Sequence, residues 1–308
     1  MRQIAEALTD IGHPEASRLA EEAAIYRADI RRAAHRAMVE APVVRLLDGT
    51  YIPRIPTRTS TRSREEGWFR EAAYGALHLC ESDVYDPAEE EMTWVLKDLE
   101  DNLFISREWG RPVDLERFWF SHGGVTIQAN LMDIAIDYLR RGDVKAGLRS
   151  LFNNFGASTY TAVRCFTEHP VIELGHGIGP HYKVSDESKA LVWLRAFLLR
   201  EADQMLHLAE GAPRAWFAPG QTPWGVQRMA TGFGPVSYRV QPTVDALTVE
   251  VEANWRQPPA ELRVHLRMPD GVTLHDVTVD DRPAAYDAEA VRIVRPAGRL
   301  TIRAAYTR

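Results

Sequence analysis

The sequence predicts a mainly α-helical chain with a β tail, and two patterns carry this prediction. Through most of residues 1–212, apolar side chains recur at the spacing of amphipathic helices. After Gly211, short runs of alternating apolar and polar residues follow one another about ten residues apart, which is typical of an antiparallel sandwich. We therefore expect a helical-hairpin domain over 1–212 and a β-sandwich domain over 213–308.

Composition argues against several classes of function. The 308 residues contain 37 Lys and Arg against 43 Asp and Glu, and the net charge of -6 argues against a dedicated nucleic-acid binder. No run approaches the roughly 18 apolar residues of a membrane span. The N-terminus has neither the basic nor the apolar region of a signal peptide, so the chain as written is predicted to be cytoplasmic. Cys80 and Cys165 are expected to be buried thiols.

The first two helices are predicted to form a hairpin over residues 2–40. Gly12 and Pro14 separate a short helix from a long one, because Gly favours a helix end and Pro favours a first turn. From Leu19 to Met38, apolar residues follow helical spacing. The first residues already belong to a helical pattern, so we expect that sequence precedes them or that a partner covers this edge.

Five further helices are predicted after a basic loop over 41–64. They cover 65–80, the segment that starts at Asp86-Pro87, 125–141, 144–155 and 186–207. Asp86 and Asp143 are suited to cap the helices that follow them. The β tail is predicted to hold six strands, which read SYRVQP, LTVEVEANW, LRVHLRM, VTLHDVTV, VRIVR and LTIRAAYT. We expect this tail to be structural, with a turn at Asp280-Asp281.

A long loop before the last helix carries most of the polar chemistry. Its side chains include Glu168, Glu173, His176, His181 and Tyr182. A loop of that length inside a compact domain is either functional or disordered, and its apolar content argues against disorder. We therefore expect the catalytic residues, if the protein is an enzyme, to lie in this loop. The spacing of Glu173, His176 and His181 matches no zinc pattern, so we predict no metal and no cofactor.

Three motifs in the sequence resemble those of a known protein family. They read CFTEHP, GHGIGPHYKVSDESK and PRAWFAPGQ, and the last is followed by the β tail. The chain resembles the six-hairpin glycosidase superfamily, in particular bacterial members that share the patterns CFxEW, PxYKxPDE and PRAWLxxGxxI. His169 stands where that group has Trp, and Val184-Ser185 replaces Thr-Pro. The resemblance implies an (α/α)6 barrel followed by a β-sandwich.

The resemblance also implies that part of the barrel is missing. The predicted helices supply only about half of those that a complete barrel contains. We therefore expect a partial toroid, with a missing N-terminal half or a partner subunit that completes it. The implied function is glycoside hydrolysis of a carbohydrate substrate, carried out by the C-terminal portion of such an enzyme.

Glycoside hydrolysis requires two carboxyl groups that flank the scissile bond. Glu168 is the first candidate, because an aromatic neighbour at Phe166 suits a proton donor. Asp186 and Glu187 are further catalytic candidates, although acids in the first turn of a helix also stabilise it. The residues expected to bind substrate are Trp119, His122, Glu173, His176, His181, Tyr182, Glu65 and Trp68. Core packing or capping is the structural alternative for each.

Two other functions fit the same residues. A toroid-type polysaccharide lyase would abstract a proton with Tyr182 or His181. A non-catalytic carbohydrate-binding or scaffold protein would need neither carboxylate. Release of an unsaturated product from uronate polymers would identify the lyase, whereas a hydrolase releases only reducing ends.

Overall fold

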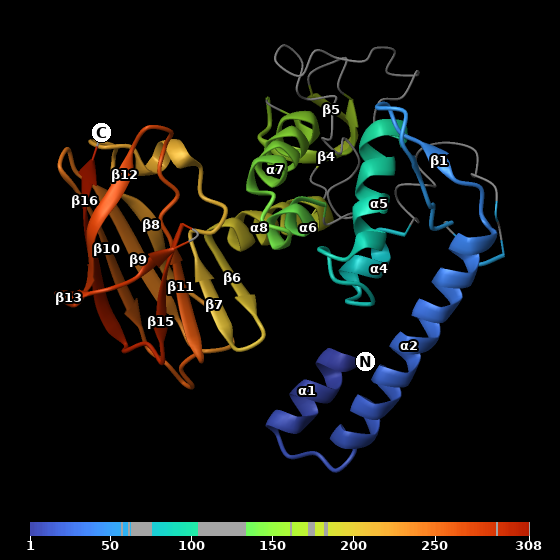
Figure 1. Cartoon of the computed structure of the whole chain (residues 1–308), viewed down its shortest axis with the longest axis horizontal. Coiled ribbons are helices and arrows are strands. Elements are labelled where there is room, and N and C mark those ends of the chain that lie inside the picture. The colour runs from blue at the N-terminus through green and yellow to red at the C-terminus, as the bar shows by residue number, and fades with distance from the viewer. Residues whose placement is uncertain are drawn as a thin grey trace. The chain divides into compact units, whose positions relative to one another are not determined.

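The computed structural model describes residues 1–56, 58–60, 62, 76–103, 134–160, 162–171, 176–181, 184–287 and 289–307. For residues 103, 153, 154, 156–158, 167–171 and 176–181 only the backbone is described. The chain folds as two compact units, Met1–Lys189 and Ala190–Arg308 (Figure 1). None of the described helices is long and apolar enough to cross a membrane.

The first unit begins with the predicted helical hairpin. Helix α1 (Arg2–Asp10) and helix α2 (Ala16–Glu40) are joined by a turn in which Gly12 has a φ of 68°. Glycine is suited to this left-handed backbone because it has no Cβ. The hairpin and its break are therefore as the sequence predicts. Strands β1 (Val44–Arg45) and β2 (Tyr51–Ile52) then pair within the stretch predicted as a loop.

Short helices form the core of the first unit. They are α4 (His78–Glu81), α5 (Glu90–Asp98), the π-helix η1 (Leu99–Leu103), α6 (Ile134–Arg140) and α7 (Val144–Ser158). Met92 and Leu96 on α5 are buried in one cluster with Ile134 and Tyr138 on α6, so the helical spacing correctly predicts the inward face of α5. Cys80 joins this cluster as a buried thiol, and Cys165 is also buried; neither of the two forms a disulfide.

The stretch predicted as a long loop contains a small sheet. Strands β3 (Thr159–Tyr160), β4 (Cys165–Val171) and β5 (His176–His181) pair in that order, antiparallel. Helix α8 (Val184–Leu198) follows. The predicted helix over 186–207 is too long, because the chain after Leu198 turns into two strands.

The second unit contains two larger sheets (Figure 1). The six-stranded sheet has the order β13 (Arg282–Pro283), β12 (Thr273–Val279), β16 (Arg299–Thr307), β10 (Ala246–Ala253), β9 (Val236–Pro242) and β8 (Trp224–Met229). The five-stranded sheet has the order β14 (Tyr286–Asp287), β15 (Ala290–Val294), β11 (Glu261–His265), β7 (Met205–Leu208) and β6 (Leu199–Ala202). The short 3-10 helix η5 (Arg214–Phe217) lies between β7 and β8 in the chain. All six predicted strands are present.

Both sheets contribute to one hydrophobic core. Leu206 on β7 and Leu262 on β11 are buried in the same cluster as Val240 on β9 and Val249 on β10. Strand alternation explains this, since every second residue of each strand faces inward. The sandwich is antiparallel with one exception, the parallel pair of β7 and β11.

The prediction of a mainly α protein with a partial toroid is wrong. The described part of the chain is 37% helical and 28% strand, with two sheets of five and six strands, so the protein is mixed α/β. Strands β3 to β7 account for much of the difference, because they occupy sequence that was assigned to a loop and a helix. Their partners fix them: Leu199 pairs with Leu208, and Leu206 pairs with Leu262 far along the chain. Such tertiary pairing overrides local helical spacing.

Candidate functional site

Two of the predicted catalytic acids, Asp186 and Glu187, lie in the first turn of helix α8, and the third, Glu168, lies in strand β4. Strand β4 begins in the interior of the first unit, because Cys165 and Phe166 are buried. The ring of Phe166 packs edge-on against Phe155 of α7, with centroids 5.3 Å apart. This packing holds the start of the strand that carries Glu168 in place.

Glu168 lies at an irregularity of the sheet. Thr167 pairs with His181 and His169 pairs with Ile178, so the register between β4 and β5 shifts at the residue between them. Such bulges redirect a side chain and are frequent beside active sites. The extra residue is in β5, because Gly179 and Pro180 lie opposite the single residue Glu168, so the bulge bends β5 beside Glu168.

Glu187 connects helix α8 to the same strand. Its Oε1 accepts a hydrogen bond from the backbone N–H of Phe166 at 3.2 Å. Glu187 is half-buried, whereas the neighbouring Asp186 is fully buried, with 0% of its surface exposed. The hydroxyl of Ser185 donates to Asp186 Oδ2 at 3.1 Å. Glu187 is thus accessible from solvent and Asp186 is not.

The remaining predicted residues divide into two groups. His176 and His181 lie in strand β5, where His176 pairs with Val171 and His181 pairs with Thr167. Only their backbone is described, as for Glu168. The other predicted substrate-binding residues lie outside the described residues; they are Trp119, His122, Glu173, Tyr182, Glu65 and Trp68.

The second unit holds a cluster that the sequence did not predict. His207 on β7, Glu210 just after it and His265 on β11 bring three donor atoms within 4.8 Å of one another. His207 Nδ1 lies 3.1 Å from His265 Nε2, and the two rings are stacked at 5.4 Å. His207-x2-Glu210 is a visible local signal, but His265 joins only through the parallel pairing of β7 with β11.

Burial determines the protonation of this cluster. Desolvation lowers the pKa of His207 to about 4, and it lowers that of His265 to the same value. Glu210 partly opposes this effect. Burial alone would raise the pKa of Glu210, but the hydrogen bonds from Arg200, at 2.6 and 2.8 Å, and the charge of Arg200 outweigh burial and lower that pKa below its ordinary value. Two neutral imidazoles therefore lie beside an ionised carboxylate at neutral pH.

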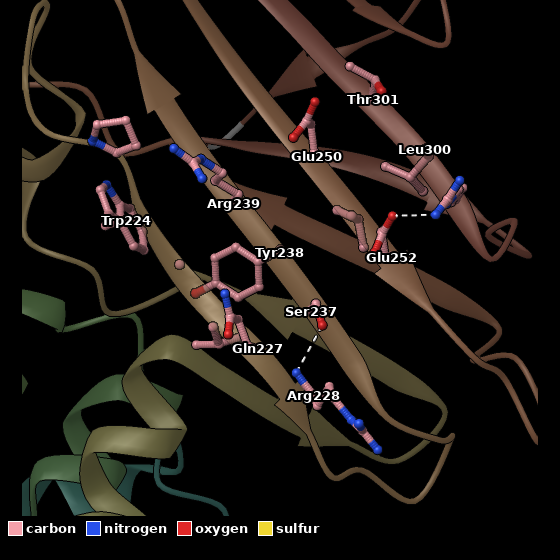
Figure 2. A pocket seen from close by; sticks show the side chains of 15 residues that line it. Trp224, Gln227, Arg228, Ser237, Tyr238, Arg239, Glu250, Glu252, Leu300 and Thr301 are labelled. Carbon is pink, nitrogen blue, oxygen red and sulfur yellow. Dashed lines mark hydrogen bonds and ion pairs between the residues drawn. The ribbon is translucent and has the colours of Figure 1, made fainter.

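A hollow of about 860 Å³ lies on the six-stranded sheet (Figure 2). Its polar lining comes from side chains on the outer face of neighbouring strands. Glu250 on β10 pairs with Arg239 on β9, and Glu252 forms an ion pair with Arg299 at 2.7 Å. Trp224 on β8 and the preceding residue, Pro223, also line the hollow. The hollow by itself assigns no function to the β tail, so the expectation that this region is structural stays a prediction.

Aromatic packing explains how Trp224 is held. Its ring contacts Trp216 and Phe217, each at 5.2 Å between centroids, and Tyr238 at 6.1 Å. Its indole N–H donates to the Trp216 carbonyl at 3.1 Å. At Gly225, an added Cβ would lie 2.0 Å from the Tyr238 carbonyl oxygen. Strand β8 can therefore approach β9 here only with glycine at this position.

Comparison with known proteins adds no family assignment. No family model matches the chain, and the search of curated proteins also gave no match.

Proposed function

We propose that the protein cleaves glycosidic bonds, with Glu168 as proton donor and Glu187 as its partner carboxylate. The observation that carries the proposal is the hydrogen bond from the Phe166 N–H to Glu187, because it places the second acid beside the strand that carries the first. The bulge in β5 opposite Glu168 adds support, since such bulges are frequent beside active sites.

The separation of the Glu168 and Glu187 carboxyl groups would decide the stereochemistry of the proposed reaction. Paired carboxyl groups in glycosidases are about 5–9.5 Å apart, the shorter distances belonging to retaining enzymes and the longer ones to inverting enzymes. Both stereochemical outcomes remain open to measurement.

The two neighbouring acids of α8 have different roles in this proposal. Asp186 is fully buried and bonded to Ser185, so it holds the start of the helix. Glu187 is half-buried and uses one carboxylate oxygen for the Phe166 N–H. An ionised carboxylate has acceptor capacity on both oxygens, which leaves the second one for a water molecule or the sugar.

Turnover of a panel of oligosaccharides by Glu168→Gln tests the proposal. This substitution keeps the side-chain shape and removes the proton donor, so turnover should fall by at least about 100-fold. Glu90→Gln, at an exposed acid in the first turn of α5, is the matched control and should leave turnover unchanged. A Glu168→Gln enzyme within a few-fold of wild type would contradict the assignment. An unsaturated product from a uronate polymer would instead identify a lyase.

Carbohydrate binding without catalysis is a second candidate, favoured by the hollow on the six-stranded sheet. Carboxylates and guanidinium groups can hydrogen-bond sugar hydroxyls, and Arg239, Glu250 and Glu252 line the hollow. Titration of soluble glycans into an Arg239→Ala, Glu250→Ala double variant should then show at least about tenfold weaker binding. Gln241→Ala, exposed on the same strand β9 but outside the hollow, is the control. Unchanged affinity of the double variant would exclude this hollow as the binding face.

A further inference from the structure

Three metal-ligating side chains converge on the five-stranded sheet of the second unit. His207 and His265 come from the parallel neighbours β7 and β11, and Glu210 follows β7 directly. Leu206 and Leu208 of β7 are buried in the core, so strand alternation turns His207 to the opposite face of the sheet. The cluster lies wholly within the second unit and does not depend on the acids of β4 and α8.

An unusual backbone conformation places Glu210. Ala209 has a φ of 60°, a left-handed region that residues with a Cβ rarely adopt. Its N–H donates to the Leu198 carbonyl at 2.7 Å, which fixes the turn. The chain consequently bends after β7, and Glu210 Oε1 lies 3.4 Å from His207 Nδ1. Backbone strain of this kind is frequent at ligand sites.

Two of the three donor separations match those within one coordination shell, and all three donor atoms lie within 4.8 Å of one another. His207 Nδ1 lies 3.1 Å from His265 Nε2 and 3.4 Å from Glu210 Oε1. Ligand atoms about 2.0–2.1 Å from a tetrahedral zinc ion are about 3.3–3.4 Å from one another. Small side-chain movements would therefore suffice to bring all three atoms onto one ion. We propose that His207, Glu210 and His265 bind a divalent transition-metal ion of the zinc class.

The chemistry of the donors selects this class of ion. Imidazole nitrogen suits zinc and its neighbours among the transition metals, whereas calcium and magnesium prefer shells of oxygen atoms. Three protein ligands leave a fourth tetrahedral position for water or another small ligand, as in catalytic rather than structural zinc sites. His207 is 4% exposed, while Glu210 and His265 are half-buried, so solvent reaches the cluster from their side.

Charged neighbours modify the affinity of the site. Arg200 donates two hydrogen bonds to Glu210 and so holds the carboxylate in place, the role of an outer-shell partner. Arg200 and Arg263 both lie opposite His207 on the adjoining strands, and their charges oppose a cation. Arg263 is neutralised in part by its ion pair with Glu261. We therefore expect weaker binding than at a site with an unpaired carboxylate.

Equilibrium dialysis of the full chain against Zn²⁺ tests the proposal. Wild type should bind one ion per chain, and His265→Ala and His207→Ala should each weaken binding by at least about tenfold. His275→Ala, at an exposed histidine of β12 outside the cluster, is the matched control and should bind as wild type does. Equal binding by wild type and both cluster variants, or an equal loss in His275→Ala, would overturn the proposal.

A second measurement needs no variant and so does not depend on how the variants fold. Co²⁺ in a four-coordinate site absorbs visible light strongly, whereas six-coordinate Co²⁺ bound at the surface absorbs weakly. Wild type loaded with one equivalent of Co²⁺ should show the strong spectrum, and Zn²⁺ should displace it. A weak spectrum would contradict the site. Both readouts are independent of glycoside cleavage, so either proposal can fail while the other holds.

Discussion

The carboxylate of Glu187 and the backbone N–H of Phe166 are 3.2 Å apart, and this contact joins helix α8 to strand β4. The two residues belong to different elements whose connection includes strand β5. The hydrogen bond therefore fixes the strand that carries Glu168 relative to the helix that carries Asp186.

Two substitutions at Glu187 separate a structural role from a catalytic one. Glu187→Gln keeps an oxygen that can accept the Phe166 N–H, so we expect thermal stability close to wild type and turnover lower by at least about 100-fold. Glu187→Ala removes the acceptor as well and should also lose about 1 kcal/mol of stability. Calorimetry and turnover measured on the same preparations provide the comparison. Full activity of Glu187→Gln would show that the residue only holds the strand.

Gly225→Ala should destabilise the sandwich by at least about 2 kcal/mol, because the new Cβ would meet the backbone of Tyr238 at 2.0 Å and cannot be accommodated by a side-chain movement. Gly271→Ala is the control. Its φ of 78° makes Ala unfavourable, but nothing lies within 4 Å, so we expect a loss of only about 1 kcal/mol. Denaturant unfolding of both variants measures the difference, and equal losses would contradict the proposed close approach of β8 and β9.

The ion pair between Arg31 and Glu89 should make the stability of the first unit depend on pH. Hydrogen bonds from Arg31, at 3.0 and 2.6 Å, are the main reason why the pKa of Glu89 is lowered from 4.5. The unfolded chain therefore binds the proton more tightly, and the contribution is present above pH 4.5 and lost as the pH falls through the folded pKa.

The size of this effect is limited by solvent. The side chains of Arg31 and Glu89 are 34% and 29% exposed, so we expect at most about 1 kcal/mol. Unfolding of wild type and Glu89→Gln at several pH values should show a smaller acid dependence in the variant. Glu90→Gln, at the exposed neighbour, should keep the wild-type dependence, and an unchanged slope in Glu89→Gln would be inconsistent with the pair.

The thiol of Cys80 should be unreactive in the folded protein. Burial is the main cause that raises its pKa well above the ordinary value, and the carboxylate of Asp137, which accepts the thiol hydrogen at 3.0 Å, raises it further. Cys165 is also buried. A thiol reagent at mildly alkaline pH should therefore label neither cysteine until the chain unfolds. Rapid labelling of a Cys165→Ser variant under native conditions would contradict the packing around Cys80.

The alternation of apolar and polar residues along the sequence made the strands of the β tail predictable. In β10, Val249 and Val251 are buried while Glu250 and Glu252 are exposed, which is the pattern visible in the sequence. The same reasoning failed for β6 and β7, because the leucines over 199–208 also fit a helix and their parallel partner β11 is distant in sequence. The strands β4 and β5 are rich in Gly, Pro and His, which offer no periodic signal.

Local sequence patterns also predict only part of each candidate site. Glu168 and Glu187 could be named from an acid-rich loop, but the hydrogen bond to Phe166 could not, because it depends on how α8 meets β4. His207 and Glu210 are close in sequence and visible together. His265 joins them only through the register that sets Arg263 opposite His207, which no local pattern encodes.

The parallel pairing of β7 with β11 also affects the order in which the chain can fold. Hairpins such as β6–β7 and β9–β10 can form as soon as their residues leave the ribosome, whereas Leu206 must wait for Leu262. Bringing such distant segments together costs chain entropy before any contact forms, so pairings of this kind are slow. Until then, one edge of β7 remains unpaired and available to other chains. Closure of the five-stranded sheet is therefore the expected slow step in folding, and the stage at which a nascent chain is most exposed to aggregation.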